Sequence, residues 1–274
     1  CSSSKANATY PGTQQAGILI DAGLSLRQFG RALAFAGIEP AAIKAIFITH
    51  EHTDHIKGLK TIAASLQVPV YASRETLEFL IRQDHIPPKS TVCEINRKLA
   101  YAGGVEVKAF HTPHDCLNSL GYRLCFEEDG KTACICTDLG CVTEEVMEHL
   151  CGSDFVLLES NYDQGLLENG PYPWFLKERI LSDHGHLSNE HCGETLITLF
   201  HNGTAKFQLG HLSEQNNRPE LAYAAALRSL AKTGAAVGED YILSVARRQT
   251  IGEWIEVRAM ASPLRRRAAR SRKA

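Results

Sequence analysis

The stretch Thr49-His50-Glu51-His52-Thr53-Asp54-His55 decides the interpretation of this sequence. Three imidazoles and one carboxylate stand within six consecutive positions, and each of these side chains can coordinate a first-row cation. Residues two apart on an extended segment share a face, so His50 and His52 are placed to bind one cation together. Asp54 and His55 are then expected to turn toward a second cation. A polar loop without a cation would cluster unsatisfied donors and like charges, so the motif predicts a metal site.

The histidine motif stands between a predicted strand and a predicted helix. The apolar run 43–49 predicts a buried strand, and 55–66 has a helical pattern. Further strands are predicted at 17–21, 68–72, 105–110, 121–126, 132–137, 155–159 and 205–210, and further helices at 25–36, 143–150, 189–200 and 219–232. A Ser cap at Ser25 opens the first of these helices. Alternation of this kind indicates an α/β fold.

Three further ligand candidates each follow a predicted strand. His114 lies just beyond 105–110, Asp138 follows 132–137, and His211 follows 205–210. In α/β sheets, ligand sites gather outside the carboxyl ends of strands, so these side chains are expected to converge on one cleft. A single strand-end His or Asp often serves only to cap a turn. Together with the histidine motif, the three residues indicate one metal centre.

The order His50-x-His52-x-Asp54-His55, then His114, Asp138 and His211, resembles the metallo-β-lactamase superfamily. Several phrases resemble its YycJ/WalJ-type branch in particular: Ile18–Gly23 (ILIDAG), Thr49–Leu59 (THEHTDHIKGL), Leu158–Asn161 (LESN), Gly170–Trp174 (GPYPW), Gly185–Asn189 (GHLSN) and His211–Asn217 (HLSEQNN). The resemblance spans most of the chain. It implies a four-layer αββα sandwich and 5′-to-3′ exonuclease activity on double-stranded DNA. The branch begins with a short strand and a turn ending in Asn-Cys, and the opening residues here leave open whether that first edge strand is present.

The resemblance also implies how the ligands divide. His50, His52 and His114 would hold one cation, Asp54, His55 and His211 would hold the other, and Asp138 would bridge both. Two cations about 3.5–4 Å apart can activate a bridging hydroxide and hold the attacking and leaving oxygens of a phosphodiester in line. Asp54 would also orient the hydroxide as a catalytic residue. All seven ligands are N or O donors, which favours Zn²⁺, with Mn²⁺ and Fe²⁺ as alternatives.

Candidate substrate contacts lie outside the metal ligands. His186 stands before a predicted helix capped by Ser188 and beginning near Asn189, where amide N–H groups suit a phosphate. An imidazole there can protonate the leaving oxygen, as a His at a similar position does in the related phosphodiesterases. Lys5 replaces a Gly of the family and is expected to contact a phosphate. In the aromatic turn 172–174, core packing is favoured over stacking on a base.

Composition excludes several classes of protein. The chain has 274 residues, enough for one α/β domain, predicted over 1–257, followed by a basic tail over 258–274 that is expected to be disordered. The nine cysteines are odd in number and lack a secreted framework, so they indicate reduced thiols in the cytoplasm. No apolar run is long enough to cross a bilayer, and no signal segment opens the chain. The net charge of −2 hides a basic end and an acidic body, which is a poor general binder of polyanions.

Three functions stay open at this point. The favoured one is a dinuclear phosphodiesterase, in particular a DNA exonuclease, with DNA preferred to RNA as the substrate. The second is a thioester or amide hydrolase of the same fold, because the fold and the metals alone do not determine the substrate. The third is a regulatory protein with a structural metal, although seven ligands and a candidate acid exceed what structural zinc needs. The sequence leaves the oligomeric state open.

Overall fold

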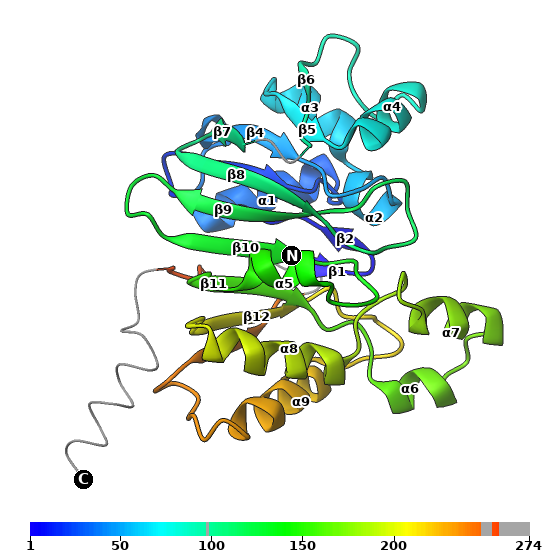
Figure 1. Cartoon of the computed structure of the whole chain (residues 1–274). Helices are drawn as coiled ribbons and strands as arrows, with labels where there is room; N and C mark the ends of the chain where they lie inside the picture. Colours follow the sequence, from blue (N-terminus) through cyan, green and yellow to red (C-terminus); the bar gives the residue numbers. More distant parts are fainter. Residues whose placement is uncertain (97–98, 248–253, 258–274) are drawn as a thin grey trace. The chain divides into compact units, whose positions relative to one another are not determined.

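The computed structural model describes residues 1–96, 99–247 and 254–257, and these form two compact units (Figure 1). Unit 1 consists of Cys1–His111, Asp115–Gly130 and the described residues of Arg247–Trp254. Unit 2 consists of Thr112–His114, Lys131–Ala246 and the described residues from Ile255 onward. One hydrolase domain over 1–257 therefore stays a prediction, and each unit is considered by itself.

Unit 1 contains two sheets and a group of helices. Its strands are β1 (Ser2–Ser3), β2 (Ala6–Asn7), β3 (Gly17–Ile20), β4 (Ile43–Phe47), β5 (Val70–Ala72), β6 (Val92–Glu94), β7 (Leu99–Ala102), β8 (Val105–His111) and β9 (Leu120–Phe126). Its helices are α1 (Leu26–Ala36), α2 (Thr53–Ile56), α3 (Leu59–Leu66) and α4 (Arg74–Arg82), with a 3-10 turn at Pro40–Ala42. Strands β3, β4, β5 and β6 form a parallel sheet, β7, β8 and β9 an antiparallel one, and β1 and β2 a short hairpin.

Helices cover one face of the parallel sheet in unit 1. Side chains of α1 and α3, such as Phe29 and Ile62, are buried in one apolar cluster with Ile46 of β4. Helix α1 begins where Ser25 and Gln28 form a reciprocal capping box, and it ends at Gly37 with φ 66°. This capping fixes where the helix leaves the sheet and where the chain returns toward β4.

The other face of the parallel sheet packs on the antiparallel sheet. Phe47 of β4 meets Tyr122 of β9 edge to face, with 5.6 Å between ring centroids. The Tyr122 hydroxyl donates to the Ile48 carbonyl at 2.6 Å, and the Leu120 amide donates to the Thr49 carbonyl at 3.1 Å. Burial raises the pKa of Tyr122 well above its usual range, so the hydroxyl stays a donor. These contacts hold the end of β4 where the histidine motif begins.

Unit 2 is a parallel sheet with helices. Its strands are β10 (Thr132–Cys136), β11 (Phe155–Glu159), β12 (Lys206–Gly210) and β13 (Ile242–Val245), hydrogen-bonded in that order. Its helices are α5 (Glu144–Leu150), α6 (Gln164–Asn169), α7 (Trp174–Leu181), α8 (Asn189–His201) and α9 (Pro219–Ala231), and α8 packs along α9 (Figure 1). Because the strands are parallel, their carboxyl ends share one edge of the sheet. Candidate ligands follow two of these ends, those of β10 and β12.

The structure confirms every strand and most helices predicted from the sequence. The helix predicted over 55–66 is wrong as a single element: it is divided into α2 and α3 at Gly58, where a Cβ would lie 1.8 Å from the Leu24 carbonyl oxygen. Among the described residues, the short strands β1 and β2 and the elements α4, α6, α7, β6, β7 and β13 were missed. The core packing predicted for the aromatic turn 172–174 is confirmed for Tyr172, which contacts a buried cluster. It is wrong for Trp174, which is 67% exposed.

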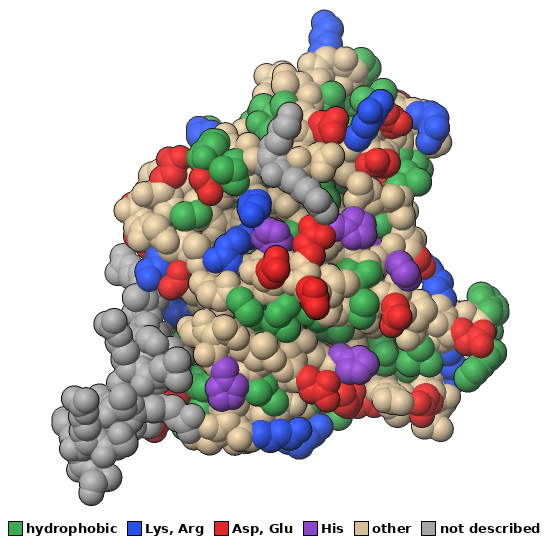
Figure 2. Space-filling view, viewed as in Figure 1, with side chains coloured by type: hydrophobic (Ala, Val, Ile, Leu, Met, Phe, Trp, Pro, Cys, Tyr) green, Lys and Arg blue, Asp and Glu red, His purple; other side chains and the backbone are tan. Residues whose placement is uncertain are grey.

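Several predictions concern the ends and the surface of the chain. The proposed basic tail 258–274 lies outside the described residues. Within the described residues, the longest helices have 13 residues each, and none is long and apolar enough to span a membrane. A location in the cytoplasm stays a prediction. On the face seen in Figure 2, acidic side chains are interspersed with Lys, Arg and His side chains.

The hydroxyl of Tyr122 provides a test of the packing in unit 1. We expect Tyr122→Phe to lower the free energy of unfolding by about 1–3 kcal/mol, because the buried Ile48 carbonyl loses its donor. Urea denaturation with an unchanged m-value measures this difference. The control is Tyr101→Phe, because that hydroxyl bonds Glu106 on the surface and the side chain is 59% exposed. Equal stability of the two variants would contradict the role given to Tyr122.

Candidate metal centre

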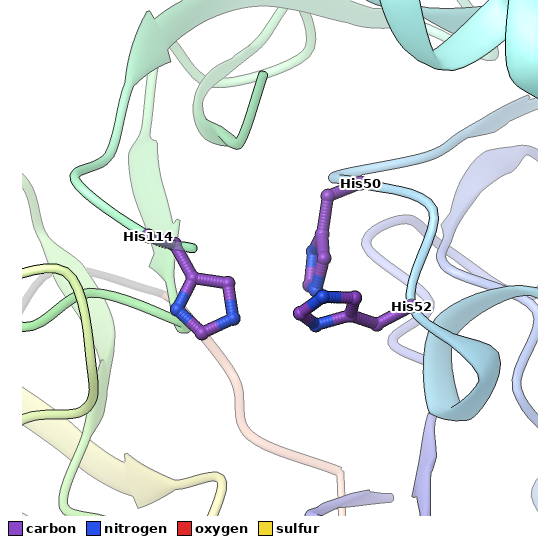
Figure 3. A group of neighbouring side chains, drawn as sticks. All are labelled: His50, His52 and His114. Carbon is purple, nitrogen blue, oxygen red and sulfur yellow. The ribbon is translucent and has the colours of Figure 1, made fainter. Parts of the chain in front are cut away.

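The histidine motif lies at the carboxyl end of β4 and continues into α2. His50 and His55 are fully buried, and their ring centroids lie 4.2 Å apart. His52 precedes α2, and its ring centroid lies 4.6 Å from that of His50. Figure 3 shows these two rings next to each other. Asp54 in the first turn of α2 places Oδ2 3.3 Å from Nε2 of His55. Unit 1 therefore brings together all four candidate ligands of the motif.

Asp21 supports this cluster, although the sequence analysis did not single it out. It directly follows β3 with φ 61°, and its side chain is buried. Its Oδ2 lies 2.8 Å from Nδ1 of His55, and its Oδ1 accepts from the Thr49 amide at 2.9 Å. A carboxylate accepts only, so Nδ1 of His55 donates and the lone pair of Nε2 is left for a cation.

The same reasoning determines the orientation of His50. The Thr49 hydroxyl lies 3.0 Å from Oδ1 of Asp21 and donates to that carboxylate. Oγ1 of Thr49 also lies 3.0 Å from Nδ1 of His50, so it accepts from that ring nitrogen. Asp21 therefore orients one ligand directly and a second through Thr49. The sequence signal for Asp21 was present in the ILIDAG phrase, because it is an acid that directly follows a buried strand.

Unit 2 brings together the remaining candidates at the carboxyl edge of its sheet. Asp138 and His211 are buried and lie just after β10 and β12, with φ 61° and 53°. Nε2 of His211 lies 3.3 Å from Oδ1 of Asp138, and Nε2 of His114 lies 3.7 Å from the same oxygen. Asp138, Glu159, His186 and His211 each offer one donor atom within 4.8 Å of the others. Within this unit, both imidazoles face the carboxylate.

Glu159 organises the unit 2 cluster, and sequence reasoning missed it. This fully buried residue ends β11; its Oε1 lies 2.7 Å from Nδ1 of His186 and 3.1 Å from Nδ1 of His211. Its Oε2 accepts from the Leu139 amide at 2.9 Å. Burial acts to raise the pKa of Glu159, but the His186 charge and hydrogen bond and the contacts with His211 outweigh it, so the pKa is lowered. An ionised Glu159 accepts from both rings and directs each Nε2 away from itself.

His114 is oriented by the segment that carries His186. Its Nδ1 donates to the Gly185 carbonyl at 2.9 Å, so Nε2 is the nitrogen that faces Asp138. Gly185 packs tightly on the end of α7, where a Cβ would lie 2.3 Å from the carbonyl oxygens of Arg179 and Ile180. Glycine at this position therefore allows the carbonyl of residue 185 to reach His114.

These contacts test whether the clusters suit divalent cations. His50, His55, His114 and His211 all use Nδ1 for an oxygen acceptor inside the protein, which fixes the tautomer with a lone pair on Nε2. Metal-binding histidines have this arrangement, because the outer hydrogen bond orients the ring and strengthens it as a ligand. The residues present therefore fit divalent cations held by N and O donors. Their identity as ligands, and that of the metal, stay predictions.

The three predicted substrate contacts occupy different environments. Ser188 caps α8 by accepting from the His191 amide at 3.0 Å, which confirms the predicted cap. Asn189 is buried, and its side chain bonds Ser160 and Asn217. Lys5 is exposed in the turn between β1 and β2. A phosphate contact stays a prediction for all three.

The fold and the donor set together define a metal-dependent hydrolase. Residues 17–205 match the family model of the beta-lactamase superfamily domain. The chain is 35% identical over 244 residues to exodeoxyribonuclease WalJ of Streptococcus pneumoniae, covering 88% of this chain and 90% of that protein. It is 34% identical over 243 residues to exodeoxyribonuclease YycJ of Bacillus anthracis, again covering 88% and 90%.

The chain therefore belongs to the metallo-β-lactamase superfamily, in the branch that contains the WalJ and YycJ proteins. The crystal structure of the metallo-beta-lactamase fold protein YhfI from Bacillus subtilis has a TM-score of 0.64 at 16% identity, covering 90% of this chain and 92% of that one. This likeness concerns the fold alone. The family and the fold class predicted from the sequence are confirmed.

Replacing Glu159 tests its role as the acceptor for two imidazoles. Glu159→Gln replaces one carboxylate oxygen with an NH₂ group, which donates and does not accept. The single oxygen left can accept from the two imidazoles or from the Leu139 amide, but not from both sides. We expect the affinity for Zn²⁺ to fall by about 10- to 100-fold, as is typical when such partners are lost. Competition with a chromophoric chelator measures the affinity.

The matched control for this variant is Glu190→Gln, an exposed acid in the first turn of α8. It makes the same chemical change on an exposed residue of the same unit. If both variants kept the wild-type affinity, Glu159 would have no role in holding the ligands.

Proposed function

We propose that this protein is a metal-dependent phosphodiesterase that degrades DNA, acting as a 5′-to-3′ exonuclease. The observation that carries the proposal is the similarity over 88% of the chain to two proteins named exodeoxyribonucleases. Supporting it, the described residues supply the N and O donors that a hydrolytic metal centre needs. DNA is the proposed partner because the names of both relatives specify deoxyribonucleic acid.

We further propose that the seven ligands predicted from the sequence hold two divalent cations. Unit 1 offers His50, His52, Asp54 and His55, and unit 2 offers His114, Asp138 and His211. The support is that all seven offer N or O donors and that the family model, over residues 17–205, includes six of them. Two bound cations supply a nucleophile at neutral pH and neutralise charge on the phosphoryl oxygens. Zn²⁺ is the proposed metal on affinity, with Mn²⁺ and Fe²⁺ as alternatives.

His186 is the proposed proton donor to the leaving oxygen. Its Nδ1 is held by the buried carboxylate of Glu159, which leaves Nε2 as the atom able to donate elsewhere. Its side chain is 20% exposed, whereas that of Glu159 is fully buried, so the imidazole is the member of the pair that a substrate can reach. The carboxylate behind the ring keeps the orientation that proton transfer requires.

Phosphate positioning is proposed for the residues around the start of α8 and for Lys5. Helix α8 is 13 residues long and begins three residues after His186, and the positive end of its dipole favours a phosphate there. Ser188 fixes this helix end, and Asn189 ties it to Ser160 and Asn217. The exposed ammonium of Lys5 would contribute a contact that weakens with salt.

A direct assay tests the proposed reaction. We expect the Zn²⁺- or Mn²⁺-loaded protein to release nucleotides from the 5′ end of labelled duplex DNA, and Asp54→Ala to abolish this release. The reason is that Asp54 is proposed both to bind a cation and to orient the nucleophile. Phosphodiester cleavage is followed on the DNA and on bis-p-nitrophenyl phosphate.

A fully metallated protein that cleaves neither substrate would contradict the proposal. That result would leave a thioester or amide hydrolase of the same family as the alternative.

The role of His186 has its own test, based on the leaving group. We expect His186→Ala to slow DNA cleavage by roughly 10²- to 10⁴-fold, because the departing alkoxide needs a proton. The same variant should lose much less activity on bis-p-nitrophenyl phosphate, since p-nitrophenolate departs without one. The ratio of the two losses in kcat is the measured quantity. Equal losses on both substrates would show that His186 does not act as the acid.

A further inference from the structure

Asn7 reaches the histidine motif from the amino-terminal hairpin. It is the last residue of β2, is buried, and pairs with Ser2 of β1. Its side-chain amide nitrogen lies 3.1 Å from Oδ2 of Asp54 and 3.0 Å from Nε2 of His55. These two atoms belong to consecutive proposed ligands that lie 47 and 48 residues further along the chain.

The hairpin fixes which end of the Asn7 amide faces the ligands. Its Oδ1 accepts from the Ser3 amide at 3.1 Å and from the Ser2 hydroxyl at 3.2 Å. Its Nδ2 donates to the Ser3 carbonyl at 2.9 Å. A backbone N–H can only donate and a carbonyl can only accept, so a flipped amide would lose both bonds to Ser3. The NH₂ group is therefore the end that points at Asp54 and His55.

The side-chain amide of Asn7 has two N–H groups but lies near three acceptors. One of the two N–H groups on Nδ2 is used by the Ser3 carbonyl, so the other is shared between Asp54 and His55. A cation on Nε2 of His55 would occupy the lone pair that competes for this N–H. The shared donor would then belong to Asp54 alone and would fix the rotation of that carboxylate.

We propose that Asn7 is a positioning residue of the metal centre, whose amide N–H orients the carboxylate of Asp54 and, before a cation binds, keeps Nε2 of His55 in place. The inference rests on the proposed function in one respect, because it takes Asp54 and His55 as ligands. A neutral donor suits this place, since it stabilises an ionised carboxylate without adding charge beside the cation. An acidic side chain in the same position would place a second negative charge beside Asp54.

The backbone holds the hairpin in place independently of the Asn7 side chain. The Gly23 amide donates to the Asn7 carbonyl at 2.9 Å, and the Thr9 amide donates to the Ile20 carbonyl at 2.8 Å. A Cβ on Gly23 would lie 1.7 Å from the Asp54 carbonyl oxygen and 2.8 Å from the Asn7 nitrogen, so the three segments meet closely. Variants of the Asn7 side chain are therefore expected to fold.

The test uses Asn7→Asp, which has the shape of the native side chain. It keeps an oxygen to accept from Ser2 and Ser3 but replaces the donor that faces Asp54 with a second oxygen. We expect one of the two bound Co²⁺ equivalents to bind about 10- to 100-fold more weakly, with an altered visible absorption band. Asn7→Ala, which lacks both groups, should show the same change without the added charge. A fall in kcat at constant KM is expected to accompany it.

The control is Ser2→Ala, which removes a donor to the amide oxygen of Asn7 but leaves Nδ2 intact. We expect it to match the wild type in Co²⁺ affinity and absorption. If both Asn7 variants fold, by circular dichroism, and bind Co²⁺ like the wild type, the positioning role is overturned. A wild type that binds two Co²⁺ ions but leaves DNA intact would refute the proposed nuclease and not this inference. A wild type that binds no Co²⁺ would overturn both.

Discussion

The metal centre depends on a simple property of imidazole: a neutral ring has one lone pair, and the hydrogen bond made by the other nitrogen decides where that pair points. In this protein Asp21, the Gly185 carbonyl and Glu159 each accept from an Nδ1, on His55, His114 and His211 respectively. Each Nε2 is thereby presented before any cation arrives. Groups oriented in advance lose less conformational entropy on binding, so the acceptors behind the rings matter as much as the ligands.

Three side chains of the two clusters lie just after buried strands and have an unfavourable backbone conformation. Asp21, Asp138 and His211 have φ values of 61°, 61° and 53°, in a region that costs a non-glycine residue about 1–3 kcal/mol. A left-handed residue directly after a strand turns the chain sharply, so its side chain stays at the carboxyl edge of the sheet. The buried hydrogen bonds of Asp21 and His211 help to hold these conformations. Backbone strain at Asp21, Asp138 and His211 is typical of residues at a functional site.

The sequence predicted what local patterns encode, and it missed what depends on distant segments. The strands before His50, His114, Asp138 and His211 were predicted from apolar runs, and the seven ligand candidates were recognised from the dense histidine motif and from their place after these strands. Asn7 and Glu159 were missed because their partners are remote: Asn7 meets Asp54 across 47 residues, and Glu159 meets His211 across 52. The break between α2 and α3 was likewise hidden, because it results from close packing of Gly58 on Leu24.

The charges in unit 2 give an argument for a cation that is independent of the family. Asp138 and Glu159 are both buried, and burying carboxylates is costly unless positive charge or several donors compensate. The imidazoles of His186 and His211 lower the pKa of Glu159 and so keep it ionised. When the His211 ring is neutral, its one proton on Nδ1 serves Glu159, and the lone pair of its Nε2 faces Oδ1 of Asp138 at 3.3 Å. Two acceptor atoms at that separation repel each other, and a divalent cation between such donors and carboxylates replaces the repulsion with attraction to both.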